Sequence, residues 1–183
     1  MAGRKALFLD RDGVINHDVG YPHRIEDIHF VDGIFGLARR FAHAGYAIVI
    51  ATNQSGIGRG LYTEADFELL MSWMRDQFAE QGIVIAAVYY CPDHPTEGIG
   101  PYRRENPWRK PGSGMFTQAA ADLDLDLAAS FSIGDKPDDM TASLGAGIGH
   151  PILFSPDAPP AAGGAWRVIR RLDDLVPPGP AGG

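Results

Sequence analysis

The stretch Leu7–Asn16 reads Leu-Phe-Leu-Asp-Arg-Asp-Gly-Val-Ile-Asn, and it indicates both a fold and a site. Its apolar run ends abruptly at two carboxylates, Asp10 and Asp12, which Gly13 follows. A short apolar run that ends in a turn is typical of a buried strand, and open α/β sheets bind ligands beyond the carboxyl ends of such strands. Two acids there repel each other unless a cation or a raised pKa compensates, so the spacing favours a hard metal ion and one acid free to act as nucleophile or proton carrier. Taken alone, the motif also fits an ordinary acidic turn.

Composition sets limits on the class of protein. With 183 residues, of which 45% are hydrophobic, we expect a single domain over residues 1–176 and a disordered tail over residues 177–183. The sequence has no secretory apolar segment and no apolar run of about 18 residues, so we expect no membrane partner. One cysteine excludes an internal disulfide and favours a reducing, cytoplasmic location. The net charge of −7 disfavours a nucleic-acid partner, and we expect a monomer.

Strand-like and helix-like segments alternate along the chain. This order predicts a Rossmann-like α/β fold of three layers with a central parallel sheet and no large cap domain. Thr63 is a good helix N-cap, and Asp66 follows three residues later. The long connection 91–112 is expected to be a functional loop, and residues 155–164, rich in Pro, Ala and Gly, are expected to form another loop. The predicted strands are residues 6–9, 46–51, 83–90, 128–133 and 151–154; the predicted helices are residues 34–44, 115–123 and a segment that begins at Thr63.

Polar residues also follow two other predicted strands and end the long loop. The second strand leads into Thr52-Asn53-Gln54-Ser55-Gly56, the loop ends in Arg109-Lys110-Pro111-Gly112, and the fourth strand leads into Gly134-Asp135-Lys136-Pro137-Asp138-Asp139. Hydroxyls, amides and cations can bind phosphate oxygens. Each segment alone could be an ordinary polar turn. Because parallel strands end at one edge of a sheet, we instead expect one shared site.

These motifs, in this order, resemble those of the haloacid dehalogenase superfamily of phosphatases with an aspartate nucleophile. Within it, the segments 10–16, 20–21, 52–60, 89–92, 109–111 and 134–136 are most similar to the heptose 1,7-bisphosphate 7-phosphatases, with histidinol-phosphate phosphatase domains as near relatives. The resemblance covers about residues 6–154. It implies hydrolysis of the 7-phosphate of D-glycero-D-manno-heptose 1,7-bisphosphate, in the synthesis of nucleotide-activated heptose for surface polysaccharide. Hydrolysis of histidinol phosphate or another small sugar phosphate is the alternative.

The resemblance also implies roles for individual residues. Asp10 would form an aspartyl-phosphate, and Asp12 would act as the general acid and base. Mg²⁺ would be held by Asp10, the backbone carbonyl of Asp12, and Asp135. Thr52 and Lys110 would bind the transferred phosphoryl group, Asp139 would support the metal site or Lys110, and Arg109 would bind the second phosphate. The substrate-binding residues it implies are Asp18, Val19, Gly20, Tyr21, Asn53, Gln54, Ser55, Arg109 and Lys136.

One departure concerns zinc. Phosphatases of this kind commonly hold a structural zinc in the long loop with a Cys-x-His pair and a later Cys-x-Cys pair. Here the first pair reads Cys91-Pro92-Asp93, with His94 displaced by one position, and the later pair reads Asn106-Pro107-Trp108. A closed zinc site needs about four Cys or His ligands, so we expect no structural zinc. Packing of Tyr102 and Trp108 could take its place.

Two other classes of function are alternatives to a small-molecule phosphatase. A receiver-like signalling module combines acids, a hydroxyl residue and a lysine at strand ends around Mg²⁺, but a general acid two residues beyond the nucleophile serves turnover. An enzyme that processes nucleic-acid ends would need a basic surface, which the acidic composition does not favour.

Overall fold

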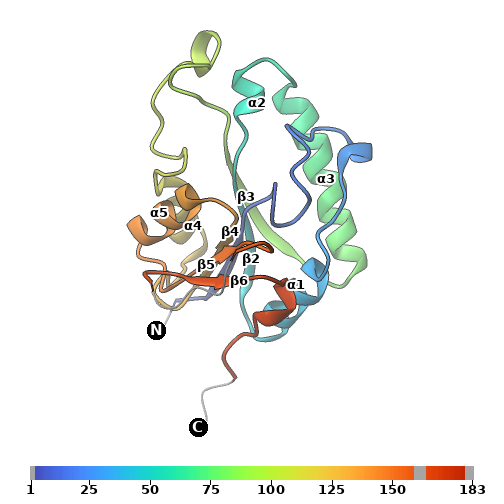
Figure 1. Cartoon of the computed structure of the whole chain (residues 1–183), viewed down its shortest axis with the longest axis vertical. Helices are drawn as coiled ribbons and strands as arrows, with labels where there is room; N and C mark the ends of the chain where they lie inside the picture. The colour runs from blue at the N-terminus through green and yellow to red at the C-terminus, as the bar shows by residue number, and fades with distance from the viewer. Residues whose placement is uncertain (1–2, 159–163, 180–183) are drawn as a thin grey trace.

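The computed structural model describes residues 3–158 and 164–179 of the chain (Figure 1). Within these ranges, a parallel sheet of six strands has the order β3-β2-β1-β4-β5-β6. This confirms the predicted Rossmann-like sheet. The strands are β1 (Ala6–Leu9), β2 (Ala47–Asn53), β3 (Ile85–Cys91), β4 (Phe131–Gly134), β5 (His150–Phe154) and β6 (Arg167–Ile169).

Helices cover both faces of the sheet (Figure 1). Side chains alternate along β1, so that Leu7 and Leu9 join one apolar cluster and Ala6 and Phe8 join the other. The first cluster packs under the helices of residues 34–43 and 64–80, and the second packs under the helix of residues 114–123. The helices are α1 (Ile34–His43), α2 (Ser55–Gly58), α3 (Glu64–Glu80), α4 (Gly114–Leu123) and α5 (Pro137–Gly145), with short 3₁₀ turns at Ile25–Asp27, Gly100–Tyr102 and Leu172–Asp174.

The long helix α3 begins where the sequence predicts. Thr63 Oγ1 accepts a hydrogen bond from the backbone N–H of Asp66 at 3.1 Å, and Asp66 Oδ2 accepts one from the Thr63 N–H at 2.8 Å. This reciprocal pair is a capping box, and it confirms Thr63 as the N-cap. The helix buries an apolar stripe, from Phe67 to Phe78, against the sheet.

Some boundaries and elements differ from the prediction. Strand β4 begins at Phe131 rather than at residue 128, because a turn at 127–129 carries the chain into the sheet. Strand β6 and helices α2 and α5 lie in segments predicted as loops or left without an element. Residues 155–158 are loop as predicted, and the rest of that segment up to residue 163 lies outside the described residues.

Residues 177–179 carry no regular secondary structure, and the remainder of the predicted tail lies outside the described residues. Among the residues that the structure describes, no helix has the length and apolar character needed to cross a membrane.

The strand order determines where a site can form. The chain builds β2 and β3 on one side of β1 and then crosses to place β4 on the other side. Open α/β sheets bind ligands at the carboxyl ends of the strands beside such a reversal. Asp10 follows β1 at this position, and its backbone N–H donates to the Ile133 carbonyl of β4 at 3.0 Å.

Candidate active site

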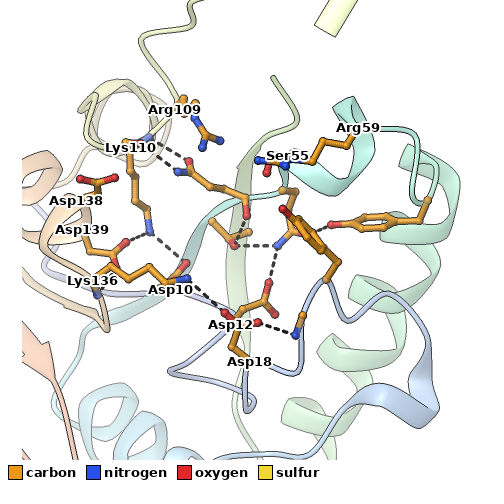
Figure 2. A pocket seen from close by; sticks show the side chains of 16 residues that line it. Asp10, Asp12, Asp18, Ser55, Arg59, Arg109, Lys110, Lys136, Asp138 and Asp139 are labelled. Atoms are coloured by element: carbon orange, nitrogen blue, oxygen red, sulfur yellow. Dashed lines mark hydrogen bonds and ion pairs between the residues drawn. The ribbon is translucent and has the colours of Figure 1, made fainter. Parts of the chain in front are cut away.

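A cavity of about 380 Å³ opens at the carboxyl end of the sheet (Figure 2). It brings together the ends of β1, β2 and β4 and the end of the 91–112 loop. Every predicted site residue lines it except Val19 and Asp135. Val19 is 56% exposed and lies outside the lining, whereas Asp135 lines the neighbouring cavity beside Asp18.

Lys110 connects two of the carboxylates. Its Nζ lies 3.2 Å from Asp10 Oδ1 and 2.7 Å from Asp139 Oδ1, and its side chain is 3% exposed. Figure 2 shows the Lys110 side chain extending between the two acids. Burial alone would lower the pKa of Lys110, but the charges of Asp10 and Asp139 outweigh it and raise that pKa. The lysine is therefore a permanent cation inside the site.

The Asp10 carboxyl is strongly perturbed. Burial raises its pKa from 3.8 to about 7; Lys110 opposes this shift, while Asp139, Asp135 and Asp12 add to it. The protein alone therefore does not supply enough positive charge to keep Asp10 ionised below neutral pH. A further cation at this position would do so.

The carboxylates can hold such a cation. One oxygen each from Asp10, Asp135 and Asp139 lie within 4.8 Å of one another, and no other cluster of three or more possible ligands occurs in the described part of the chain. Asp135 Oδ1 is buried without a hydrogen-bond partner among the described residues, and burial raises the pKa of Asp135. Hard oxygen ligands on a crowded, partly desolvated set of acids suit Mg²⁺. The residues present thus fit the predicted metal.

Helix α5 fixes Asp139 in this cluster. Asp139 Oδ2 accepts a hydrogen bond from the Lys136 backbone N–H at 3.0 Å, which caps the first turn of the helix. Its own carbonyl accepts from Ser143 Oγ at 2.7 Å. Its other oxygen, Oδ1, remains for Lys110. The first turn of α5 therefore sets the orientation of the Lys110 side chain.

Asp12 is held by a buried arginine that the sequence analysis did not single out. Arg11 Nε and Nη2 donate to the two oxygens of Asp12 at 2.9 and 3.0 Å, and the Arg11 side chain is fully buried. Asn16 Nδ2 and Gln54 Nε2 donate to the same carboxylate at 3.0 and 3.3 Å. Asp12 keeps a 17% exposed side chain in the cavity lining. The carboxylate is thus fixed in position and still accessible.

The polar turn after β2 ties the elements together. Gln54 Nε2 also donates to Thr52 Oγ1 at 3.0 Å, and Gln54 Oε1 accepts from the Tyr62 hydroxyl at 2.5 Å. Asn53 exchanges two hydrogen bonds with the Lys110 backbone, at 3.0 and 3.1 Å. The loop end that carries Lys110 is therefore fixed to the end of β2.

Three cations surround the opening of the cavity. Lys136 Nζ lies 3.3 Å from Asp18 Oδ2, Arg59 pairs with Glu97, and Arg109 lies at the end of the long loop. Figure 2 shows Arg59 and Arg109 above the Asp10–Lys110 pair. The Arg59 guanidinium also lies over the Tyr21 ring, 5.6 Å from its centre. The opening of the cavity therefore carries cations in addition to the buried Lys110.

The sequence analysis missed four residues that shape the site. Arg59, Tyr62 and Asp138 line the cavity, and buried Arg11 holds Asp12. Arg11 and Arg59 lie within the recognised segments 10–16 and 52–60. Their basic side chains were therefore the available signal. Asp138 is part of the recognised segment 134–139, whereas Tyr62 offered no signal, because its position depends on how α2 folds.

Comparisons with known proteins show the family of the chain. A family model described as polynucleotide kinase 3 phosphatase matches residues 19–145. A Burkholderia mallei D-glycero-alpha-D-manno-heptose-1,7-bisphosphate 7-phosphatase is 48% identical over 184 residues, covering 98% of this chain and 97% of the relative. The chain belongs to the heptose 1,7-bisphosphate 7-phosphatase family of the haloacid dehalogenase superfamily. It is accordingly a phosphoric monoester hydrolase.

Two further members show the range of the family. An Escherichia coli relative named for the beta anomer of the same heptose bisphosphate is 43% identical, covering 93% of this chain and 91% of the relative. The crystal structure of D,D-heptose 1,7-bisphosphate phosphatase from B. bronchiseptica, complexed with magnesium and phosphate, superposes with a TM-score of 0.77 at 30% identity. It covers 92% of this chain and 93% of that one. Family members are thus named for either anomer.

Proposed function

We propose that this chain is a Mg²⁺-dependent phosphatase that removes the 7-phosphate of D-glycero-D-manno-heptose 1,7-bisphosphate. The observation that carries the proposal is the position of Asp10, which lies in the cavity beside the buried Lys110 cation and within ligand reach of Asp135 and Asp139. The names of the two relatives at 48% and 43% identity support the choice of substrate.

Asp10 is the nucleophile of the proposed reaction. Its carboxylate attacks the phosphorus of the 7-phosphate, and the bond from phosphorus to the sugar oxygen breaks while Asp12 gives that oxygen a proton. In the second step Asp12 takes a proton from a water molecule. The oxygen of that water attacks the phosphorus of the aspartyl-phosphate, and the bond from phosphorus to the Asp10 oxygen breaks. Asp10 is regenerated and inorganic phosphate leaves.

The remaining residues stabilise charge. Asp10, Asp135 and the Asp12 backbone carbonyl would hold Mg²⁺, with Asp139 in support. When bound, Mg²⁺ keeps Asp10 ionised and lets two anions approach each other. Lys110 and the Thr52 hydroxyl bind oxygens of the transferred phosphoryl group, where the charge of a desolvated lysine acts strongly.

The cations at the cavity opening bind the second phosphate. Arg109 is the main donor, since a guanidinium binds phosphate through two parallel hydrogen bonds. Arg59 faces the same opening and adds charge, and Lys136 contributes with the segment 18–21. Asn53, Gln54 and Ser55 complete the pocket. A bisphosphate engages these cations with its second phosphate, whereas a monophosphate does not reach them.

We further propose the setting in which the enzyme works. A cytoplasmic monomer that supplies nucleotide-activated heptose for surface polysaccharide agrees with the single, buried Cys91 and with the family. The net charge of −7 favours a small phosphorylated sugar over nucleic acid as the partner.

Steady-state kinetics on both heptose 1,7-bisphosphate anomers, histidinol phosphate and a sugar monophosphate test the proposal. We expect the highest kcat/KM on one heptose bisphosphate anomer and no turnover by Asp10→Asn.

Arg109→Ala removes one partner of a charged pair, which costs about 2–5 kcal/mol when the pair is fully desolvated and less at a partly open site. Its kcat/KM should fall strongly on the bisphosphate and weakly on the monophosphate. Arg103→Ala, an exposed arginine of the same loop, is the matched control. Preference for histidinol phosphate, or equal losses in Arg109→Ala, would contradict the assignment.

A further inference from the structure

The long loop 91–112 does not carry the ligands of a structural zinc. The four positions at which the family places zinc ligands hold Cys91, Asp93, Asn106 and Trp108 in this chain. An indole and an amide are not zinc ligands of such sites. Asp93 uses one carboxylate oxygen, Oδ2, for two hydrogen bonds, so only its Oδ1 and the Cys91 thiol remain as ligands at these four positions. The residues present therefore do not fit a closed zinc site.

A buried carboxylate occupies the centre of the loop instead. Asp93 is 0% exposed. Its Oδ2 accepts from Arg104 Nε at 2.8 Å and from Asn106 Nδ2 at 2.6 Å. These donors come from the returning limb of the loop, eleven and thirteen residues further along. One anion thus joins the outgoing limb to the returning limb, which is the structural task of a metal ion in such a loop.

The same cluster leads directly to Arg109. Asn106 accepts at both of its oxygens: Oδ1 from the Trp108 backbone N–H and the carbonyl from the Arg109 backbone N–H, each at 2.9 Å. Arg109 Nη1 in turn donates to the Asp93 carbonyl at 3.3 Å. Both the backbone and the guanidinium of Arg109 are therefore tied to the two residues that pair across the loop.

The predicted aromatic packing is present but lies elsewhere. Tyr102 donates its hydroxyl to Glu64 of α3 at 2.6 Å, and Trp108 packs edge-on against Tyr89 of β3. These contacts fix the loop to the body of the protein. They do not join the two limbs to each other, so the packing alone does not orient Arg109.

We propose that Asp93 is a positioning residue that joins the two limbs of the loop without zinc and thereby fixes Arg109 toward the second phosphate. The inference rests on the proposed function for its link to the bisphosphate, but the loop contacts themselves do not depend on the substrate. Because Asp93 is a buried carboxylate that accepts one charged and one neutral donor, removing its charge should loosen the loop and Arg109 together.

The first experiment needs no substrate. Native-state trypsin cleavage after Arg103 and Arg104 reports how often the loop opens. We expect Asp93→Asn to be cut about tenfold faster than the wild type, in line with the loss of one charge-assisted hydrogen bond. Glu105→Gln, which removes an exposed carboxylate from the same loop, should be cut like the wild type. Equal cleavage of Asp93→Asn and the wild type would overturn the proposal.

The second experiment tests the link to Arg109. Asp93→Asn should raise KM for the bisphosphate about tenfold with kcat within about twofold, and leave the sugar monophosphate nearly unchanged. In an Arg109→Ala background the effect of Asp93→Asn on KM should disappear, because it acts through Arg109. Arg104→Gln, whose side chain is 64% exposed, gives a milder change in the same direction without disturbing the core. A KM effect that persists without Arg109 would overturn the positioning role.

The two experiments separate this inference from the proposed function. If trypsin cleaves the loop of Asp93→Asn faster while Arg109→Ala affects both substrates alike, the bisphosphate assignment fails and the role of Asp93 in joining the limbs stands.

A third experiment, elemental analysis, measures the zinc content of the purified protein. Asp93 Oδ1 is buried without a partner among the described residues, so it could serve as a ligand. We expect far less than one equivalent of zinc, and stoichiometric zinc would overturn the inference.

Discussion

Replacing Asp10 by Asn should make the metal-free protein more stable while it abolishes turnover. The Asp10 carboxyl lies in a buried cluster with Asp135 and Asp139, and burial raises its pKa from 3.8 to about 7. Between these two pH values the unfolded chain releases the proton and the folded protein keeps it. Raising the pH therefore favours unfolding across this window, and the full penalty is present above pH 7. An amide cannot ionise and escapes the penalty.

The size of the effect follows from the pKa. The interval from 3.8 to about 7, at 1.36 kcal/mol per pKa unit, corresponds to an upper limit of about 4 kcal/mol at alkaline pH and to almost nothing below about pH 4. The attraction between Lys110 and Asp10 is already contained in this pKa, so it need not be subtracted again. Lys110 also keeps its 2.7 Å partner, Asp139, in the variant.

Urea unfolding of both proteins in EDTA, from about pH 4 to about pH 8.5, measures the difference in the free energy of unfolding. We expect the curves to coincide at acidic pH and to separate progressively toward pH 7, with Asp10→Asn more stable. Asp138→Asn removes one exposed carboxylate from the edge of the same cavity and controls for a general charge effect. A constant difference at every pH, or a less stable Asp10→Asn at pH 8, would refute the account of Asp10 as a desolvated, crowded carboxyl.

Three further substitutions address chemistry, metal binding and folding. Asp12→Asn should lower kcat by about 10²–10⁴, and rapid quench should reveal accumulated phospho-enzyme; a wild-type rate would remove its acid–base role. At Gly13, with φ +91°, a Cβ would overlap the Asp135 carboxylate, so Gly13→Ala should raise the Mg²⁺ concentration for half-maximal activity about 10–100-fold, and an unchanged magnesium titration would count against Asp135 as a ligand. Thr63→Ala removes the N-cap bonded to Asp66 and should cost about 1 kcal/mol in urea unfolding while KM and kcat stay unchanged; no loss of stability would mean that this cap is redundant.

The sequence predicts the elements that have a strong local signal. The apolar run ending at Asp10 predicts β1 correctly, and the capping residues at Thr63 predict the start of α3. Strand β6 has only three residues, the first of them an exposed arginine, and it exists because β5 offers it a parallel edge. Such elements depend on tertiary pairing, so no local pattern announces them.

The candidate site shows the same division. Carboxylates and cations that follow strands are visible as motifs, because the strand itself predicts where they meet. The pairing of Arg11 with Asp12 and of Asp93 with Asn106 is not visible, since a buried arginine and a buried carboxylate are exceptions to ordinary burial preferences. The sequence gives the residue types of the loop, but only the folded limbs show that Asp93 lies between them.

The wide spacing of the site residues along the chain has a consequence for folding kinetics. Lys110 bonds to Asp10 across 100 residues, and Leu7 of the central strand pairs with Phe131. Contacts of such high sequence separation form late, after the entropy of closing long loops has been overcome. A ligand that binds the finished carboxylate cluster therefore has nothing to bind in the early stages of folding. It should slow unfolding and leave the refolding rate unchanged, so that occupancy of the active site prolongs the lifetime of the native state without hastening its formation.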